Sequence, residues 1–547
     1  MTLFRLLAVA ALAGVLTESA QAEDPPAACA ALANSVNAVR FTQLIDAPTT
    51  ILSARLVAAG GDGTIIENDF PEHCRIEGQV APTVGFLLRM PTRSWNGKFM
   101  FGGCGGPCGN YLTDRVDPAL ARHYAVVVTD MGHKGQGWGW AWDNLPGQID
   151  FGWRSTHVTA IAAKAIVAEF YGKAASKNYY FGCSTGGRQG MVSAQRVPKD
   201  FDGIVAGAPV WNQTGNNPYF GSWNAVVNID RKTMQPILDS SKLPLIHKAV
   251  MAACDAIDGL ADGLLQDPRR CAWDPAEILC KGRAADNCLT KPEADVVRKI
   301  YQGATNAQGE PFFFGMARGS EDQWAPVWIN AKGLPGAALG GPGLIANSMQ
   351  QYVSFYTEAG PFYSAMDFDY ERDPERLAMK EYIFNAQNPD LRKFKKAGGK
   401  LILYTGWHDN NIPPEAAIDY YETATQTMGG AATTMDFFRL FMLPAVNHCR
   451  YGFGGGEVDW ITAIENWIER GIAPEQVIAH HITTEPYPSI ERPGGDPGDR
   501  LTRPPRHPLP VGSFDRARPV YPYPEIAEFS GSGDAAKPEN WRKAAKP

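Results

Sequence analysis

The sequence predicts an α/β fold whose parallel sheet is interrupted by a large insertion. Strand-like apolar segments alternate with segments of helical periodicity in the first 210 residues, as in a sheet covered by helices. The next clear strand follows only at 400–404. The stretch between is rich in Gly, Pro, aromatic residues and cysteines, so we interpret it as an insertion.

The individual elements follow from the spacing of the apolar residues. A run of Ala and Val at 125–128 indicates a buried strand, whereas apolar residues at 159–171 recur at helical spacing. Applied along the chain, the same criteria predict strands at 125–128, 178–181, 204–206, 400–404 and 438–443, and helices at 159–171, 187–197 and 458–468.

The N-terminus indicates export. Arg5 precedes an apolar run from Leu6 to Leu16, and Ala20-Gln21-Ala22 offers a small-residue cleavage site. The run is shorter than the roughly 20 residues that span a bilayer, and no later segment is long and apolar enough. Residues 1–22 are therefore predicted to be a signal peptide, and the mature chain is expected to be secreted or periplasmic. Ten cysteines suit that oxidising environment.

Composition limits the domain organisation and the partners. A chain of 547 residues with 44% hydrophobic content can form a large core and a sizeable insertion. A formal net charge of -7 gives no basic footprint for nucleic acid. No membrane partner is expected, and the sequence does not indicate an oligomeric state. We expect a signal peptide at 1–22, the two parts of the core at 23–210 and 396–547, and an inserted domain at 211–395.

The segment 182–186, Gly-Cys-Ser-Thr-Gly, matches the G-x-S-x-G nucleophile elbow of α/β-hydrolases. It lies between a predicted strand and a predicted helix, as the elbow requires. Ser184 is then the nucleophile, and the Thr185 amide at the helix N-terminus is an oxyanion donor. The alternative is a glycine-rich turn without chemistry.

A second oxyanion donor is expected from the glycine-rich segment 102–106, which follows the apolar residues 99–101. Its glycines let backbone amides approach a ligand. We favour Gly105, with Gly106 nearly as good a candidate. The alternative is a turn that simply needs positive φ.

The remaining two members of a triad follow from chain order, which in this fold is Ser, acid, His. Asp409 comes just after the strand at 400–404, and His448 lies between the strand at 438–443 and the next helix. His408 precedes the acid and is too early to be the base. His480 and His481 alternate as strand residues do.

Cys183 directly precedes the nucleophile candidate, and Cys449 directly follows the base candidate. If they pair, they hold Ser184 against His448. A crosslink that closes so long a loop stabilises by about 4 to 5 kcal/mol in the chain-entropy model.

A calcium site is predicted in the acidic segment 254–264. Oxygen ligands suit a hard cation such as Ca²⁺, and Cys254 with Cys271 would staple the segment. The alternative is an acidic, solvated turn. Any metal role is expected to be structural. The candidate ligands are the side chains of Asp255, Asp258 and Asp262 and the carbonyls of Leu260 and Leu264.

Several further segments, together with the Cys183-Ser184 and His448-Cys449 couples, resemble the tannase and feruloyl esterase family, which includes mono(2-hydroxyethyl) terephthalate hydrolases. The resemblance implies an α/β-hydrolase core with a large inserted lid domain that holds structural calcium. It also implies the disulfides Cys29–Cys74, Cys183–Cys449, Cys254–Cys271 and Cys280–Cys288. The segments are Trp-Asn-Gly-Lys-Phe at 95–99, Thr-Asp-Met-Gly-His at 129–133, Asp-Phe-Gly-Trp-Arg at 150–154, Gly-Trp-His-Asp at 406–409 and Tyr-Pro-Tyr-Pro at 521–524.

The chain departs from the family pattern at Cys104 and Cys108, which lie in the glycine-rich loop. They form either a local disulfide that stiffens the loop or two free thiols. This choice affects the loop geometry and the assignment of Gly105.

The resemblance implies a serine carboxylesterase that hydrolyses small esters of aromatic acids, feruloyl (hydroxycinnamoyl) or galloyl. A terephthalate monoester is less favoured as a substrate because no arginine is evident for its second carboxylate. A non-catalytic binding protein on the same scaffold and a peptidase are the competing hypotheses. Aromatic residues available to stack on the acyl group are Trp324, Trp328, Phe355, Tyr356, Phe362 and Tyr363.

Overall fold

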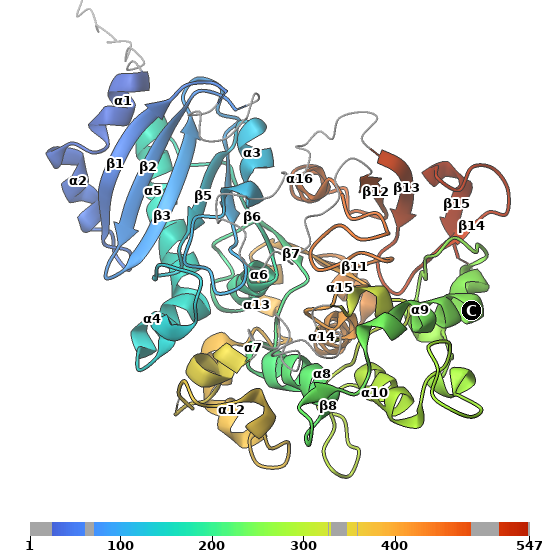
Figure 1. Cartoon of the computed structure of the whole chain (residues 1–547). Coiled ribbons are helices and arrows are strands. Elements are labelled where there is room, and N and C mark those ends of the chain that lie inside the picture. Colours follow the sequence, from blue (N-terminus) through green and yellow to red (C-terminus); the bar gives the residue numbers. More distant parts are fainter. Residues whose placement is uncertain are drawn as a thin grey trace, which may run out of the picture.

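The computed structural model describes residues 25–60, 70–325, 328–329, 347–357, 359–482 and 514–544. The predicted signal peptide lies outside them. A nine-stranded sheet in the order β1-β2-β3-β5-β4-β6-β7-β10-β11 forms the centre (Figure 1). Its strands are β1 (Thr49–Val57), β2 (His73–Val80), β3 (Val84–Pro91), β4 (Lys98–Gly102), β5 (Ala125–Thr129), β6 (Lys177–Cys183), β7 (Gly203–Gly207), β10 (Lys400–Gly406) and β11 (Phe438–Leu443).

The sheet changes from antiparallel to parallel pairing at β5. β1, β2, β3 and β5 pair antiparallel, and from β5 to β11 every neighbouring pair is parallel. β5 lies between β3 and β4, so the chain crosses over before it continues through β6 and β7. This arrangement confirms the predicted α/β-hydrolase core.

Helices cover both faces of the sheet, which explains the unbroken apolar run in β5. Val127 packs in the cluster that contains residues of α5, α6 and α14, whereas Val126 and Val128 pack with residues of α3 and α16. A strand buried on both faces needs apolar residues throughout. The helices are α3 (Asp117–Ala121), α5 (Ser155–Tyr171), α6 (Thr185–Arg196), α14 (Pro414–Thr427) and α16 (Trp460–Arg470).

Two helices begin earlier than the apolar spacing predicts. α5 starts at Ser155 rather than at 159, and α6 starts at Thr185 rather than at 187. Their first turns carry Ser, Thr and Gly, which an apolar pattern does not mark.

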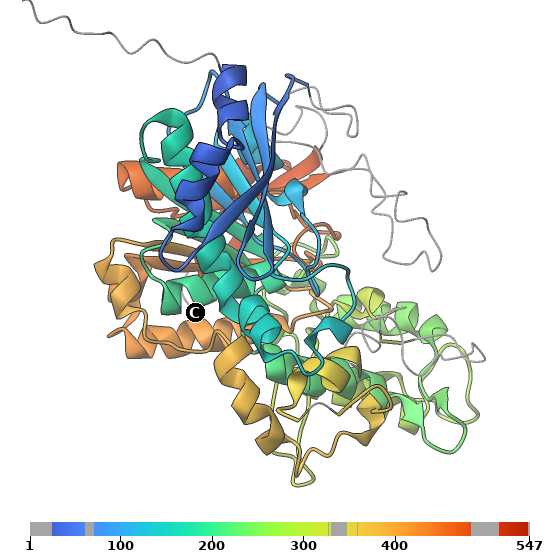
Figure 2. The same cartoon turned by 90° about the vertical axis from the view of Figure 1, so that its left-hand side faces the viewer.

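The described part of the stretch between β7 and β10 adds no strand to the nine-stranded sheet. It has a cluster of its own and gathers on one side of the core, below it in Figures 1 and 2. Three of the aromatic residues available for stacking, Trp324, Trp328 and Phe355, are buried. The boundaries 211–395 and a lid role stay predictions. Its larger helices are α9 (Leu243–Cys254), α10 (Lys291–Gln302) and α12 (Pro374–Phe384).

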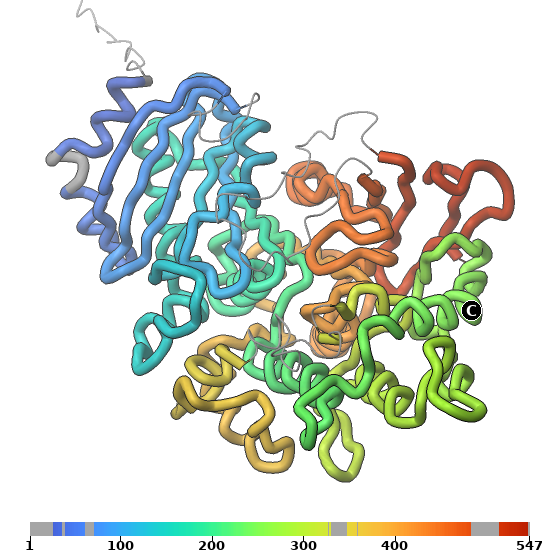
Figure 3. Tube along the Cα trace, in the orientation of Figure 1, coloured from blue at the N-terminus to red at the C-terminus, as the bar shows by residue number. Residues whose placement is uncertain are grey.

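The C-terminal segment forms short strands, and the first of them contains His480 and His481, whose alternation indicated a strand. β12 (Val477–Ile482) pairs with β13 (Phe514–Val520), and β14 (Ala527–Phe529) pairs with β15 (Trp541–Lys543). In this segment, the red part of the tube in Figure 3, β14 contacts the turn Asp255–Asp258 that follows α9. None of the helices in the described ranges combines the length and the apolar character that crossing a membrane requires.

Five disulfides crosslink the chain. The four pairs that the family resemblance implies are all present: Cys29–Cys74, Cys183–Cys449, Cys254–Cys271 and Cys280–Cys288. Cys104 pairs with Cys108, so the glycine-rich loop contains a local disulfide rather than two free thiols.

Candidate active site

Ser184 occupies a sharp turn between β6 and α6. Its φ is +64°, a region that a residue with a side chain rarely adopts. The turn leaves no room at its glycines: a Cβ on Gly182 would lie 2.7 Å from the Gly186 carbonyl carbon, and one on Gly186 would lie 2.7 Å from the Cys104 oxygen. The Ser184 amide donates to the Gly207 carbonyl at 2.9 Å. This is the geometry of a nucleophile elbow.

Asp409 and His448 meet across the carboxyl ends of β10 and β11. His448 Nδ1 lies 2.8 Å from Asp409 Oδ2. Since a carboxylate only accepts, Nδ1 carries the proton and Nε2 keeps a free lone pair. The Asp409 carboxylate is fully buried, whereas the His448 side chain is 21% exposed. The buried Asp409 carboxylate therefore orients the imidazole, and part of the imidazole stays accessible to solvent.

A disulfide links this pair to the elbow. Cys183 and Cys449 are 266 positions apart in the chain, and their Cα atoms lie 5.8 Å from each other. Each is the direct neighbour of Ser184 or His448. Among the described residues, the Ser184 hydroxyl makes no hydrogen bond to His448; such bonds commonly tighten only when substrate binds. The covalent link between their chain neighbours limits how far Ser184 and His448 can move apart.

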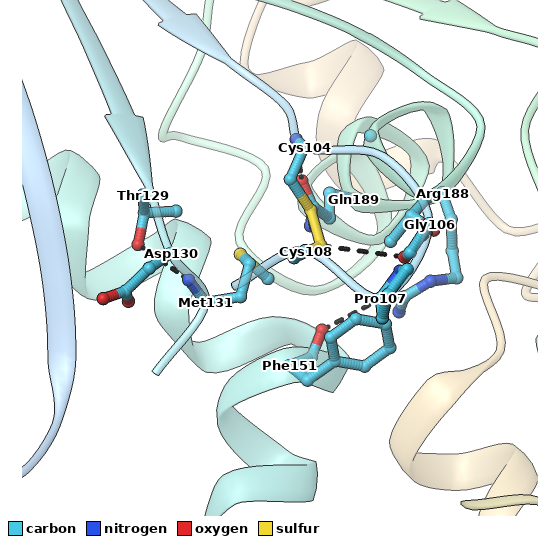
Figure 4. Close-up of a disulfide and its surroundings, with 12 residues drawn as sticks. Cys104, Gly106, Pro107, Cys108, Thr129, Asp130, Met131, Phe151, Arg188 and Gln189 are labelled. Carbon is cyan, nitrogen blue, oxygen red and sulfur yellow. Dashed lines mark hydrogen bonds between the residues drawn. A yellow bond between two sulfur atoms is a disulfide. The ribbon is translucent and has the colours of Figure 1, made fainter. Parts of the chain in front are cut away.

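The glycine-rich loop after β4 lies against the start of α6. The Thr185 hydroxyl donates to the Gly106 carbonyl at 2.8 Å, and the Gly105 carbonyl accepts from the Cys108 amide at 3.0 Å. The Gly105 amide donates to no residue in the described part of the chain. The disulfide between Cys104 and Cys108 closes the loop (Figure 4). Gly105 thus keeps a free donor beside the elbow.

Within the described residues, no group of three or more His, Cys, Asp or Glu side chains is placed to hold a metal ion. Both Asp255 oxygens accept from the Gly263 amide at 3.0 Å, and Asp258 Oδ1 accepts from the Leu260 amide at 3.2 Å. Asp262 Oδ2 is paired with Arg518. Several carboxylate oxygens of the acidic loop are therefore already engaged within the protein.

Two oxygens of this loop are nevertheless buried without a hydrogen-bond partner among the described residues: Asp258 Oδ2 and Asp262 Oδ1. Burial, and to a lesser degree the Asp262 charge, raises the pKa of Asp258 to about 6. The carbonyls of Leu260 and Leu264 accept no backbone hydrogen bond from the described part of the chain. Calcium binds carboxylate oxygens together with backbone carbonyls and waters, so this donor set fits Ca²⁺.

The site also depends on residues whose importance spacing alone does not reveal. Arg188, one turn into α6, is fully buried and donates to the carbonyls of Phe151, Gly152 and Phe384 at 2.7 to 3.0 Å. Burial lowers its pKa to about 9. It ties the helix behind Ser184 to both the core and the insertion, and only the folded structure brings these carbonyls together.

Comparison with known proteins agrees with this geometry. The family model described as "Tannase and feruloyl esterase" matches residues 69–544. The chain is 32% identical to the mono(2-hydroxyethyl) terephthalate hydrolase of Piscinibacter sakaiensis, over 87% of this chain and 85% of that one. It is 31% identical to the probable feruloyl esterase B-2 of Aspergillus terreus, over 76% and 80% of the two chains.

The fold agrees as well. The crystal structure of an esterase from Aspergillus oryzae superposes with a TM-score of 0.80 at 25% identity, covering 95% of this chain and all of that one. The resemblance seen in the motifs is therefore confirmed over most of the molecule. The chain belongs to the tannase and feruloyl esterase family.

Proposed function

We propose that the protein is a serine carboxylic-ester hydrolase acting on small esters of aromatic acids. The observation that carries the proposal is the Asp409–His448 hydrogen bond of 2.8 Å, tied by the Cys183–Cys449 disulfide to a serine in an elbow conformation. A non-catalytic binding protein would not need the hydrogen bond, the disulfide and the serine turn in combination.

The reaction would proceed by acyl transfer. His448 Nε2 takes the Ser184 proton as Ser184 Oγ attacks the ester carbonyl, and Asp409 stabilises the imidazolium that forms. The amides of Thr185 and Gly105 bind the oxyanion. The protonated His448 gives its proton to the departing alcohol, which leaves an acyl-enzyme. His448 then activates a water molecule, which releases the acid and restores Ser184.

Feruloyl (hydroxycinnamoyl) and galloyl esters are the proposed substrates, in keeping with the family. A mono(2-hydroxyethyl) terephthalate-type monoester is the second candidate, because one relative at 32% identity carries that name. The identities of the relatives do not separate the two, since the probable feruloyl esterase is 31% identical.

We also propose that the acidic loop binds one structural Ca²⁺ through Asp258 and Asp262. Each has a buried carboxylate oxygen without a hydrogen-bond partner among the described residues, and a cation would satisfy it. We propose that the protein works outside the cytoplasm, because its five disulfides form and persist in an oxidising compartment.

The test is hydrolysis of methyl ferulate, methyl gallate and mono(2-hydroxyethyl) terephthalate by the purified protein and by Ser184→Ala. Turnover of at least one ester, reduced about 10⁴-fold or more in the variant, is expected because the nucleophile is lost. Circular dichroism would verify that the variant is folded. A fluorophosphonate probe should label the parent and not the variant. Failure of the parent to label, or undiminished turnover by Ser184→Ala, would overturn the proposal.

A further inference from the structure

We infer that the Cys104–Cys108 disulfide is a positioning device for catalysis, which holds the Gly105 amide as an oxyanion donor in fixed register with Ser184. The inference rests on the proposed esterase function and adds residues to it. Three side chains share this role: Thr185, through its hydroxyl, together with Gln189 and His133.

The disulfide first restricts the loop itself. It closes a ring over residues 104–108, and the Cys108 amide donates across the ring to the Gly105 carbonyl at 3.0 Å. Both cysteines are buried. The carbonyl of Gly105 is held inside the ring, and its amide has no hydrogen-bond partner among the described residues, so it is available to an oxyanion. A ring this short has few conformations, so the direction of that amide is largely fixed before substrate arrives.

Helix α6 then fixes the ring relative to the nucleophile. The Thr185 hydroxyl donates to the Gly106 carbonyl at 2.8 Å, and Gln189 Nε2 donates to Cys104 Sγ at 3.0 Å. Figure 4 shows Gln189 directed at the disulfide. Both side chains belong to the helix that starts directly after Ser184, so the loop and the nucleophile share one support.

A third contact comes from the segment that follows β5. His133 Nε2 donates to the Pro107 carbonyl at 2.7 Å, and its ring stacks on Trp140 with the centroids 4.2 Å apart. The carbonyls of Gly105, Gly106 and Pro107 are therefore all occupied, each by a different donor. The backbone between the two cysteines cannot rotate without breaking at least one of these bonds.

A fixed Gly105 amide should stabilise the transition state more than the bound substrate. An amide that already points at the developing oxyanion costs no reorganisation when negative charge appears. Loss of the disulfide should therefore lower kcat and leave KM nearly unchanged. A disulfide that only stabilised the folded state would change neither constant below the unfolding temperature.

The experiment compares Cys104→Ser/Cys108→Ser with Cys280→Ser/Cys288→Ser, which removes another short-range disulfide from the insertion. We expect kcat to fall by about tenfold or more in the first variant, with KM within about twofold of the parent. Affinity for benzeneboronic acid, which forms a tetrahedral adduct with the serine, should fall by a similar factor. The control should match the parent. Parent-like kcat and boronate affinity in the first variant, or equal losses in both variants, would overturn the inference.

If the first variant does not fold, Thr185→Val and Thr185→Ser replace it. Both keep the Thr185 amide, but only Ser keeps a hydroxyl for the Gly106 carbonyl. We expect a lower kcat for Val than for Ser, because only Ser can hold the Gly106 carbonyl, and equal kcat in the two variants would refute the positioning role of the Thr185 hydroxyl. A parent that boronate does not inhibit and that Ser184→Ala matches in turnover would instead refute the proposed function.

Discussion

The Asp409 carboxylate has both of its oxygens engaged. Oδ1 accepts from the amides of Asn411 and Ile412 at 2.9 Å, and Oδ2 accepts from His448 Nδ1 at 2.8 Å. Two backbone amides prevent the group from rotating. The imidazole is consequently held in one tautomer and one orientation, and it is this restraint that an uncharged substitute would lose.

Asp409→Asn is expected to lower kcat by about 10³- to 10⁴-fold with little change in KM. If the amide oxygen stays on the two backbone amides, its NH₂ group faces His448 Nδ1 and forces the proton to Nε2. Steady-state kinetics on the preferred ester would measure this loss. The matched control is Asp322→Asn, since Asp322 lies 4.0 Å from the neighbouring His408 and outside the triad. Equal activity of the two variants would remove Asp409 from the mechanism.

The three residues of the proposed triad could be selected from sequence because each sits at the end of a recognisable strand. Ser184, Asp409 and His448 follow β6, β10 and β11 in the order that the fold requires. The supports of the glycine-rich loop could not be predicted in this way. His133 and Gln189 reach the loop through contacts between separate elements, and neither has a spacing that marks it.

At the level of elements, the strands that could be predicted are those with an unbroken apolar sequence. β5 and β10 are buried along nearly their whole length and have unbroken apolar runs. The antiparallel strands β1 to β3 were not predicted. β1 alternates buried and exposed residues, and β3 carries Arg89, which is buried against Asp117 at 2.6 Å. An arginine in a buried strand becomes understandable only once its partner is known.

The acidic loop joins elements that are distant in sequence. Asp255–Asp258 follows α9 of the insertion, and Arg518 of β13 reaches back from the C-terminal segment to Asp262. A guanidinium neutralises one carboxylate, yet Asp258 Oδ2 and Asp262 Oδ1 stay unpaired among the described residues. A bound divalent cation would satisfy both oxygens.

Calcium is expected to raise the unfolding temperature by a few degrees, because a ligand that binds only the folded state stabilises it by about 2.7 kcal/mol at 100 times Kd. Scanning calorimetry in Ca²⁺ and in EGTA measures the shift. Asp258→Asn should abolish it, whereas Asp286→Asn, at an exposed position, should leave it intact. Identical unfolding temperatures in Ca²⁺ and EGTA would mean that the loop binds no Ca²⁺ and that the charge of Asp262 is balanced by Arg518.

At the scale of the whole molecule, the buried acid Glu457 lies where strand β12 of the C-terminal segment joins the core. Glu457 pairs with His480 of β12 through reciprocal backbone hydrogen bonds, while its Oε1 has no partner among the described residues. Burial raises the pKa of Glu457 from 4.5 to about 7, against the opposing effect of Arg450. Folding therefore favours the protonated acid, and the stability of the molecule depends on pH here.

The direction of that dependence follows from the raised pKa. Glu457 contributes its full stability below pH 4.5, where it is protonated in both states, and this contribution declines as the pH rises from about 4.5 to about 7. Glu457→Gln stays uncharged, so its free energy of unfolding relative to the parent should rise over this window, by on the order of 1 to 3 kcal/mol. Urea unfolding at pH 5 and pH 8 measures the difference. The exposed acid in Glu310→Gln should show none. A difference that is the same at both pH values would show that Glu457 is ionised throughout, stabilised by Arg450 despite its burial.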